Sequence, residues 1–183
     1  MTSVCVFGGA SPNVDHEFLD MAFAIGALLA KNNINVVFGG GALGMMGALA
    51  DGVLKHQGNI TGVIPHFLLE RETPHPGVAN MRLVDSMHER KSIMYDMADI
   101  FLTLPGGFGT LEESLEVITW KQLSLHEKSI IVLDHAAFWC NLAATFDIMR
   151  DNAFLSSADR DAILFANTPE EALMLLKSTL AKP

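Results

Sequence analysis

Short apolar runs alternate along the chain with longer segments in which apolar residues recur at helical spacing. The runs of strand length are Ser3–Gly8, Ile34–Phe38, Asn59–Ile64, Met81–Val84, Ile100–Leu104, Ser129–Leu133 and Ile163–Phe165. The segments of helical period are Glu17–Lys31, Gly44–His56, Met87–Ala98, Thr110–Leu123, Phe138–Arg150 and Pro169–Leu180. Strands that are apolar throughout and alternate with helices predict an α/β fold, with a mostly parallel sheet covered by helices on both faces.

The organisation of the chain predicts one folding unit. No linker, repeat or low-complexity tract interrupts the 183 residues, of which 50% are hydrophobic and 18% are charged. A chain of this length and composition can bury one sizeable core. The final helix has a clear start, because Thr168, Pro169 and Glu171 match a capping box with proline at the first helical position. We therefore expect a single domain over residues 1–183.

Charge and cysteine content narrow the class of protein. The net charge of −9 argues against a general nucleic-acid binder, which normally carries a basic face. No apolar run approaches the ~18 residues of a membrane span, and the first residues lack the features of a signal peptide. Cys5 and Cys140 have no C-x-x-C spacing and are expected to be reduced thiols. We expect a cytoplasmic protein that binds neither nucleic acid nor membranes.

Three of the predicted strands end in glycine-rich loops, at Gly8–Ser11, Gly39–Gly44 and Gly106–Thr110. The carboxyl ends of parallel strands meet at one edge of a sheet, which is where such folds bind ligands. Glycine lets the backbone approach a ligand closely, and a helix start just beyond the loop offers N–H groups to a phosphate. The loops predict a site for a phosphorylated ligand, although glycine could serve only the packing of tight turns. The candidate binding residues in these loops are Gly9, Ser11, Gly40, Gly41, Gly44, Gly106, Gly107 and Gly109.

The second loop also satisfies the G-x-G-x-x-G pattern of dinucleotide-binding proteins, through Gly39, Gly41 and Gly44. A dinucleotide site needs in addition an acidic residue at the end of the next strand, where this chain has Val63-Ile64-Pro65. No glycine-lysine-serine/threonine sequence follows any of the loops, which excludes a Walker A loop. A nicotinamide-dependent reductase is therefore a weak hypothesis.

Arg90 falls on the apolar face of the helix that is predicted from Met87 onward. Ser86 and Glu89 match a capping box at the start of this helix, and Arg90 lies three residues after Met87, on the same stripe. A buried arginine needs an anionic partner, which is either a protein carboxylate or a ligand phosphate. Spacing alone leaves both possibilities open. Lys91 lies one position further around the helix and could assist, although a solvated lysine is the more common outcome.

Two adjacent glutamates follow the third glycine loop. Thr110 and Glu113 match a capping box, in which the carboxylate of Glu113 would bond to the start of the helix. The alternative is catalytic, because a carboxylate beside a glycine loop can lie next to a bound sugar and stabilise the oxocarbenium-like state of glycoside cleavage. Glu112 and Glu113 point about 100° apart on a helix, so they cannot both face one atom. The pattern does not choose between them.

Other chemistries find little support in the sequence. The seven histidines show no H-E-x-x-H or other metal-ligand spacing, so no metal site is predicted. The G-x-S-x-G elbow of many serine hydrolases is also absent from the sequence.

A family resemblance enters at the third loop. Pro105-Gly106-Gly107-Phe108-Gly109-Thr110-Leu111-Glu112-Glu113 resembles the P-G-G-x-G-T-x-x-E signature of the LOG family, the cytokinin riboside 5′-monophosphate phosphoribohydrolases. Met87-His88-Glu89-Arg90-Lys91 resembles the second part of that signature. The resemblance covers nearly the whole chain in order, including Gly39–Gly47, Gly62–Pro65 and Glu116–Trp120.

The resemblance implies a Rossmann-like fold and a homodimer whose active sites lie near the subunit interface. It implies hydrolysis of a nucleoside 5′-monophosphate to the free base and ribose 5-phosphate, without a metal or organic cofactor. Carried over by position, Arg90 and Glu113 are the expected catalytic pair. Met87, Lys91 and the residues from Gly106 to Glu112 are expected to line the nucleotide site, with Thr110 at the phosphate.

The substrate and the occurrence of catalysis stay open. Phe67–Asn80 matches the family least well and could border the base pocket, so a cytokinin nucleotide and plain AMP are both candidates. The alternative function is a non-catalytic nucleotide-binding or sensing module. Such a module would keep the glycine loops and Arg90 but tolerate the loss of Glu113.

Overall fold

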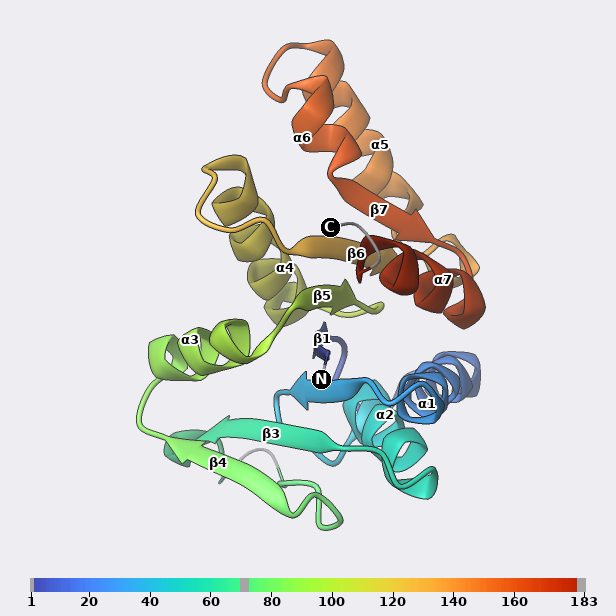
Figure 1. Ribbon diagram of the computed structural model, residues 1–183, viewed down its shortest axis with the longest axis vertical. Helices are drawn as coiled ribbons and strands as arrows, with labels where there is room; N and C mark the ends of the chain where they lie inside the picture. The colour runs from blue at the N-terminus through green and yellow to red at the C-terminus, as the bar shows by residue number, and fades with distance from the viewer. Residues whose placement is uncertain (1, 70–72, 181–183) are drawn as a thin grey trace.

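The computed structural model describes residues 2–69 and 73–180, and the strands within them form one seven-stranded sheet (Figure 1). The strands are β1 (Ser3–Phe7), β2 (Asn35–Phe38), β3 (Ile60–Pro65), β4 (Asn80–Val84), β5 (Ile100–Thr103), β6 (Ser129–Leu133) and β7 (Ile163–Ala166). Their order across the sheet is β4-β3-β2-β1-β5-β6-β7, and each neighbouring pair is parallel. The α/β fold with a parallel sheet, predicted from the alternation of apolar runs, is confirmed.

Helices cover both faces of this sheet (Figure 1). On one face lie α1 (His16–Lys31), α2 (Gly44–Lys55) and α7 (Pro169–Leu180). On the other face lie α3 (Met87–Met97), α4 (Phe108–Gln122) and α5 (Cys140–Asp151). The short helix α6 (Ser157–Asp161) precedes β7, and two 3₁₀ turns follow β3 and β6, η1 (His66–Leu68) and η2 (His135–Ala137).

The strands are buried because their apolar side chains alternate between the two covered faces. In β1, Val4 and Val6 pack on the side of α1 and α2, whereas Cys5 and Phe7 pack on the side of α3 and α4. Each of these four residues is at most 1% exposed. A parallel sheet requires this pattern, since the helices that connect its strands lie on both faces. The continuous apolar runs in the sequence therefore reflect two cores that share one sheet.

The start of α4 differs from the prediction. The helix begins at Phe108, with Gly107 as its N-cap in an extended conformation and no side-chain cap. Thr110 is therefore the third helical residue, and the predicted capping box of Thr110 and Glu113 is wrong. Glycine can occupy the N-cap position without a capping side chain, so the helix starts before the threonine that the pattern favours.

Two more differences occur after β6. The predicted helix over Phe138–Arg150 begins at Cys140 instead. The backbone before it is not helical, because Ala136 and Ala137 adopt positive φ angles of 53° and 56°. The prediction also lacks α6, which is five residues long and begins with a capping box of Ser156 and Asp159.

Two other predicted caps form at the expected serine or threonine, but in each the glutamate accepts from the residue before the N-cap, Asn167 in α7 and Asp85 in α3. At the start of α7, Thr168 Oγ1 accepts a hydrogen bond from the N–H of Glu171 at 3.2 Å, as predicted. The carboxylate of Glu171 accepts from the N–H of Asn167 at 2.7 Å, one residue before the expected donor. Ser86 likewise caps α3 by accepting from the N–H of Glu89 at 3.1 Å.

The strand order places a ligand site at a defined point. From β1 the sheet extends in one direction through β2 to β4, and the chain then returns to the other side of β1 to form β5, β6 and β7. The switch point lies between β1 and β5. Open α/β sheets bind ligands beyond the carboxyl ends of their strands at this point, and the loops after β1, β2 and β5 meet here.

Candidate active site

A cavity of about 330 Å³ lies at the switch point between β1 and β5. All three predicted glycine loops contribute to its lining. The predicted site residues that line it are Gly9, Ser11, Gly41, Met87, Arg90, Gly107, Gly109, Thr110, Glu112 and Glu113. The apolar part of the lining comes from β1 and α2, through Val6, Phe7 and Met46. Segments that are far apart in the sequence thus surround one space.

Three predicted site glycines lie outside the cavity lining. Gly40 and Gly44 have φ angles of 85° and 59°, a conformation that glycine adopts without strain. Gly106 lies against the first loop, where a Cβ atom on it would come within 2.9 Å of the backbone nitrogen of Gly9. These glycines shape the loops that form the cavity, and their roles as ligand contacts stay predictions.

Arg90 is held at the cavity by the ends of two strands. Its Nε donates to the carbonyl oxygen of Val63 at 3.1 Å, and its Nη2 donates to the carbonyl oxygen of Gly39 at 3.2 Å. The third contact runs from Nη1 to the sulfur of Met87 at 3.8 Å. These three acceptors are uncharged, so they orient the guanidinium without neutralising its charge. Val63 lies in the last part of β3, near the position where a dinucleotide site would need an acidic residue, and here its carbonyl binds Arg90.

The carboxylate of Glu113 lies close enough to β1 to act on its buried side chains. Burial raises the pKa of the Cys5 thiol well above its ordinary value, and the negative charge of Glu113 adds to this increase. The positive charge of Arg90 acts on the same thiol in the opposite direction. The charges of both members of the predicted catalytic pair therefore act on the Cys5 thiol. Both residues line the same cavity, Arg90 from α3 and Glu113 from α4.

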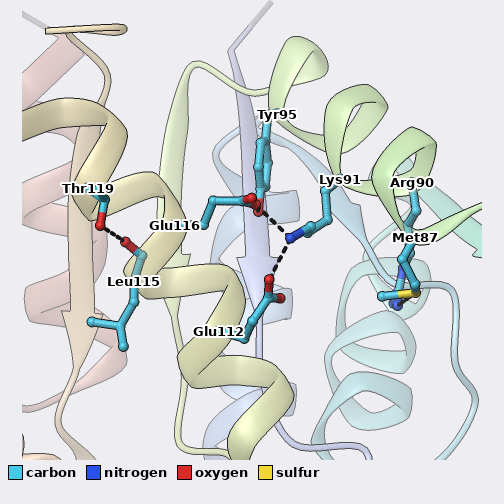
Figure 2. Close-up of polar contacts among 8 residues, drawn as sticks. All are labelled: Met87, Arg90, Lys91, Tyr95, Glu112, Leu115, Glu116 and Thr119. Atoms are coloured by element: carbon cyan, nitrogen blue, oxygen red, sulfur yellow. Dashed lines mark hydrogen bonds and ion pairs between the residues drawn. The ribbon is translucent and has the colours of Figure 1, made fainter. Parts of the chain in front are cut away.

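Lys91 lies beside the cavity, and its role at the nucleotide site stays a prediction. It is 8% exposed and is absent from the cavity lining. Its Nζ is 2.5 Å from Glu112 Oε1 and 2.9 Å from Glu116 Oε2, so it bridges α3 and α4 (Figure 2). Burial alone lowers the pKa of Lys91, but the hydrogen bonds and charges of the two glutamates outweigh burial and raise it. The lysine is thus neither solvated nor directed at the cavity.

Sequence reasoning missed two residues of this network, Glu116 and Tyr95. The hydroxyl of Tyr95 donates to Glu116 Oε2 at 2.6 Å (Figure 2). A signal was present, because Glu116 follows Glu112 by four residues and Tyr95 follows Lys91 by four. Residues at this spacing share one face of a helix, which identifies matching polar faces on α3 and α4.

The start of α4 is suited to a phosphate. The N–H groups of the first helical turn lack partners within the helix and carry partial positive charge. This turn forms part of the cavity wall through Gly107, Gly109 and Thr110. A Cβ atom on Gly107 or Gly109 would meet no atom within 4 Å. The backbone here is therefore accessible to a ligand on the cavity side.

The described part of Phe67–Asn80 supports the second glycine loop from outside the cavity. Ala42 donates to the carbonyl of Thr73 at 2.9 Å, and His75 donates to the carbonyl of Gly40 at 2.9 Å. None of the described residues in this segment lines the cavity, and residues 70–72 lie outside the described part of the chain.

Within residues 2–69 and 73–180, no group of three or more His, Cys, Asp or Glu residues is arranged to hold a metal ion. The same residues contain no helix long and apolar enough to cross a membrane.

The strand order and the position of the cavity define a Rossmann-like α/β protein with its ligand site at the switch point. Residues 46–176 match the family described as possible lysine decarboxylase. A probable cytokinin riboside 5′-monophosphate phosphoribohydrolase of Oryza sativa subsp. japonica is 38% identical over 96% of this chain and 70% of its own length. A cytokinin riboside 5′-monophosphate phosphoribohydrolase of Arabidopsis thaliana is 37% identical over 95% of this chain and 81% of its own length. The chain belongs to this family, the LOG family.

Solved structures confirm the fold. The molybdenum cofactor carrier protein from Chlamydomonas reinhardtii superposes with a TM-score of 0.76 over 99% of both chains, at 20% sequence identity. The molybdenum cofactor binding protein from Rippkaea orientalis superposes with a TM-score of 0.73 over 98% of both chains, also at 20% identity. Likeness at this level of identity extends to the fold and no further.

The family description as a decarboxylase does not fit the residues of the cavity. A pyridoxal-dependent decarboxylase needs a lysine in its site to bind the cofactor as a Schiff base. No lysine of the described residues lines the cavity, and the nearby Lys91 bonds to two carboxylates.

Proposed function

We propose that this protein hydrolyses the N-glycosidic bond of a nucleoside 5′-monophosphate and releases the free base and ribose 5-phosphate. The observation that carries the proposal is the joint position of Arg90 and Glu113, which face one glycine-lined cavity at the switch point of the sheet. The names of the curated relatives support the same reaction.

The cavity supplies the groups that this reaction needs. The bond between ribose C1′ and the base nitrogen breaks, and positive charge develops on the ribose in an oxocarbenium-like state. Glu113 stabilises that charge and accepts a proton from the attacking water, whose hydroxyl adds to C1′. The same proton then passes to the base nitrogen, so the base leaves protonated and the carboxylate is restored. Arg90, oriented by Val63 and Gly39, contributes a fixed positive charge that holds the anionic nucleotide. The first turn of α4, with Thr110, receives the phosphate.

The test is incubation of the pure protein with AMP and with isopentenyladenosine monophosphate, followed by chromatography of the free base. Glu113→Gln should abolish release of the base while nucleotide binding persists, and Arg90→Ala should weaken both. Exposed residues of the same type provide matched controls, Glu127→Gln and Arg82→Ala, which should behave as the unmodified protein does. Nucleotide binding without release of base in the unmodified protein would favour the sensing module.

The ratio of the two rates decides the base. The cavity lining combines apolar side chains, such as Val6, Phe7 and Met46, with the charged pair. An apolar wall is compatible with adenine and with a prenylated adenine, so the assay compares both. Activity that persists in the presence of a metal chelator would support the expectation that the reaction needs no metal.

We also propose a homodimer that forms through the surface of α4, α5 and the segment after α5. Leu115, Ile148, Met149 and Phe154 are 40%, 61%, 38% and 80% exposed on this surface. A groove of about 160 Å³ lies in the same region, with Leu115 and Met149 in its lining. Contiguous exposed apolar residues mark interaction sites. Ile148→Asp should convert a dimer to a monomer in light-scattering measurements, and a dimer that persists would place the interface elsewhere.

The proposed compartment is the cytoplasm. Cys5 is buried on β1 and Cys140 is exposed at the start of α5, and both are free thiols. Reduced cysteines are typical of cytosolic proteins. Localisation of the tagged protein in fractionated cells tests this proposal.

A further inference from the structure

A polar network joins α3 to α4 beside the cavity, and we call it the brace. It consists of Lys91 and Tyr95 on α3 and of Glu112 and Glu116 on α4 (Figure 2). Lys91 Nζ contacts one oxygen of each glutamate, and the Tyr95 hydroxyl donates to the same oxygen of Glu116 that Lys91 contacts. One buried ammonium thus connects two carboxylates that lie one helical turn apart.

The end of the brace away from the cavity is fixed by aromatic packing. The ring of Tyr95 makes edge-on contacts with Phe7, Phe101 and Trp120, at centroid distances of 6.1, 5.6 and 5.1 Å. Burial and the hydrogen bond to Glu116 raise the pKa of Tyr95, so its hydroxyl stays protonated and continues to donate. Glu116 is therefore held from two sides, and Lys91 in turn is held by Glu116.

The near end of the brace lies beside the proposed catalytic pair. Lys91 follows Arg90 directly, and Glu112 precedes Glu113 directly. α3 packs on β1 and β3, whereas α4 packs on β1 and β5. The separation of Arg90 from Glu113 thus depends on how these two helices are placed on the sheet, where they share only β1, and the brace connects the helices next to both residues.

The brace also controls the charge at the cavity rim. Glu112 lines the cavity, and its charge would repel an anionic nucleotide. The ammonium of Lys91, 2.5 Å from Glu112 Oε1, compensates that charge. Without the ammonium, two carboxylates that now share one cation would repel each other at the first turns of α4, where Glu113 lies.

We propose that Lys91 is a positioning residue and not a nucleotide ligand: held between Glu112 and Glu116, it sets the separation of Arg90 and Glu113. The inference rests on the proposed nucleotide hydrolysis. It assigns to Glu116 and Tyr95 a role in turnover, although neither lines the cavity.

The experiment compares Lys91→Met, Glu116→Gln and the double variant in steady-state hydrolysis of AMP. Misplacement of catalytic groups by about 1 Å costs on the order of 100-fold in rate, so we expect each single variant to lose roughly 10- to 100-fold in kcat. KM and the calorimetric Kd for AMP should change much less than kcat. The double variant should lose no more than the worse single variant, because both remove the same connection. Lys177→Met and Glu127→Gln are the exposed controls.

Tyr95→Phe is the milder variant if the others fold poorly. It removes one hydroxyl, keeps the packed ring, and should lower kcat without changing Kd. Lys91→Arg should recover activity relative to Lys91→Met, because a guanidinium can bond to both carboxylates. A large rise in Kd for Lys91→Met with an unaffected Glu116→Gln would overturn the proposal, as would single variants with unchanged kcat.

Failure of the proposed function is separable from failure of the brace. If the unmodified protein binds AMP but releases no base, the hydrolase proposal is wrong. The Kd of Lys91→Met for AMP then tests the role of Lys91. Unchanged binding supports the positioning role, and strongly weakened binding overturns it. If the unmodified protein neither binds nor hydrolyses AMP, both proposals fall.

Discussion

Gly39→Ala tests whether the strand end of β2 sets the position of Arg90. Gly39 does not have a positive φ angle, so alanine can adopt its backbone conformation. A Cβ atom at this position would overlap Nη2 of Arg90 and lie 3.2 Å from its Cζ. The three nearest atoms all belong to the guanidinium group, at the end of a flexible side chain. The substitution should therefore displace the guanidinium and leave the backbone in place.

The expected effects on stability and on turnover differ in size. Displacement removes the 3.2 Å hydrogen bond from Arg90 to the Gly39 carbonyl, and a bond to a charged group contributes about 1.5–3 kcal/mol. Arg90 is only partly buried, so the lower end applies. Replacement of glycine by alanine at a compatible φ returns about 0.4–1 kcal/mol. The free energy of unfolding should fall by about 1 kcal/mol, whereas a shift of roughly 1 Å in a catalytic group costs on the order of 100-fold in rate.

Urea unfolding and the kcat/KM for AMP measure the two effects. The matched control is the Arg90→Ala background, in which Gly39→Ala should cause no further loss of activity because its target is absent. A Gly39→Ala variant with the activity of the unmodified protein would refute the reasoning. A further loss in the Arg90→Ala background would show that Gly39 acts by another route.

Three further predictions follow from the loops and from one histidine. Gly44→Ala should lower the free energy of unfolding by at least the ~1–2 kcal/mol of left-handed strain, since its φ is 59° and a Cβ atom would lie 2.7 Å from the carbonyl carbon of Ala10; urea unfolding checks this, and a smaller loss contradicts it. Gly109→Ala should keep the melting temperature but raise the KM for AMP, because the added Cβ meets no protein atom within 4 Å and the residue lines the cavity; an unchanged KM would count against the placement of the ligand. Burial lowers the pKa of His126, whose Nδ1 accepts from the N–H of Lys128, so the folded state binds a proton less readily than the unfolded state. Stability should accordingly decrease as the pH falls below the unfolded value of about 6.5, and His126→Gln should show a smaller decrease between pH 7.5 and 5.5 in urea unfolding; equal decreases would contradict the assignment.

The fold was predictable because most of its strands are buried on both faces, the edge strand β4 being the exception. A strand such as β1 is apolar at every position that packs, so the run is visible in the sequence without knowledge of its neighbours. The start of α4 was not predictable in this way. Gly107 is the N-cap of this helix and provides no capping side chain, and the capping signal of Thr110, three residues later, pointed to the wrong residue. Capping patterns describe side-chain bonds, and they do not identify a helix that begins without one.

The site was predictable to the extent that it depends on strand ends. Parallel strands bring their carboxyl ends to one edge, so three glycine loops could be placed together before any distance was known. The position of Lys91 could not be obtained from its own helix. Its burial depends on Glu112 and Glu116, which another helix supplies from 21 or more residues away in the sequence. Spacing on α3 shows which residues share a face, but not which charges lie opposite that face.

The brace also bears on the choice between the two adjacent glutamates. Glu112 accepts a bond of 2.5 Å from the buried ammonium of Lys91. The charge of a carboxylate that is paired in this way is largely compensated by the ammonium, so less of it acts on a developing oxocarbenium ion. Glu113 lines the same cavity, and its charge contributes to the raised pKa of the buried Cys5 thiol on β1. The ion pair with Lys91 thus gives Glu112 the role of holding α4 against α3, and the assignment of catalysis to Glu113 stays a prediction that Glu113→Gln tests.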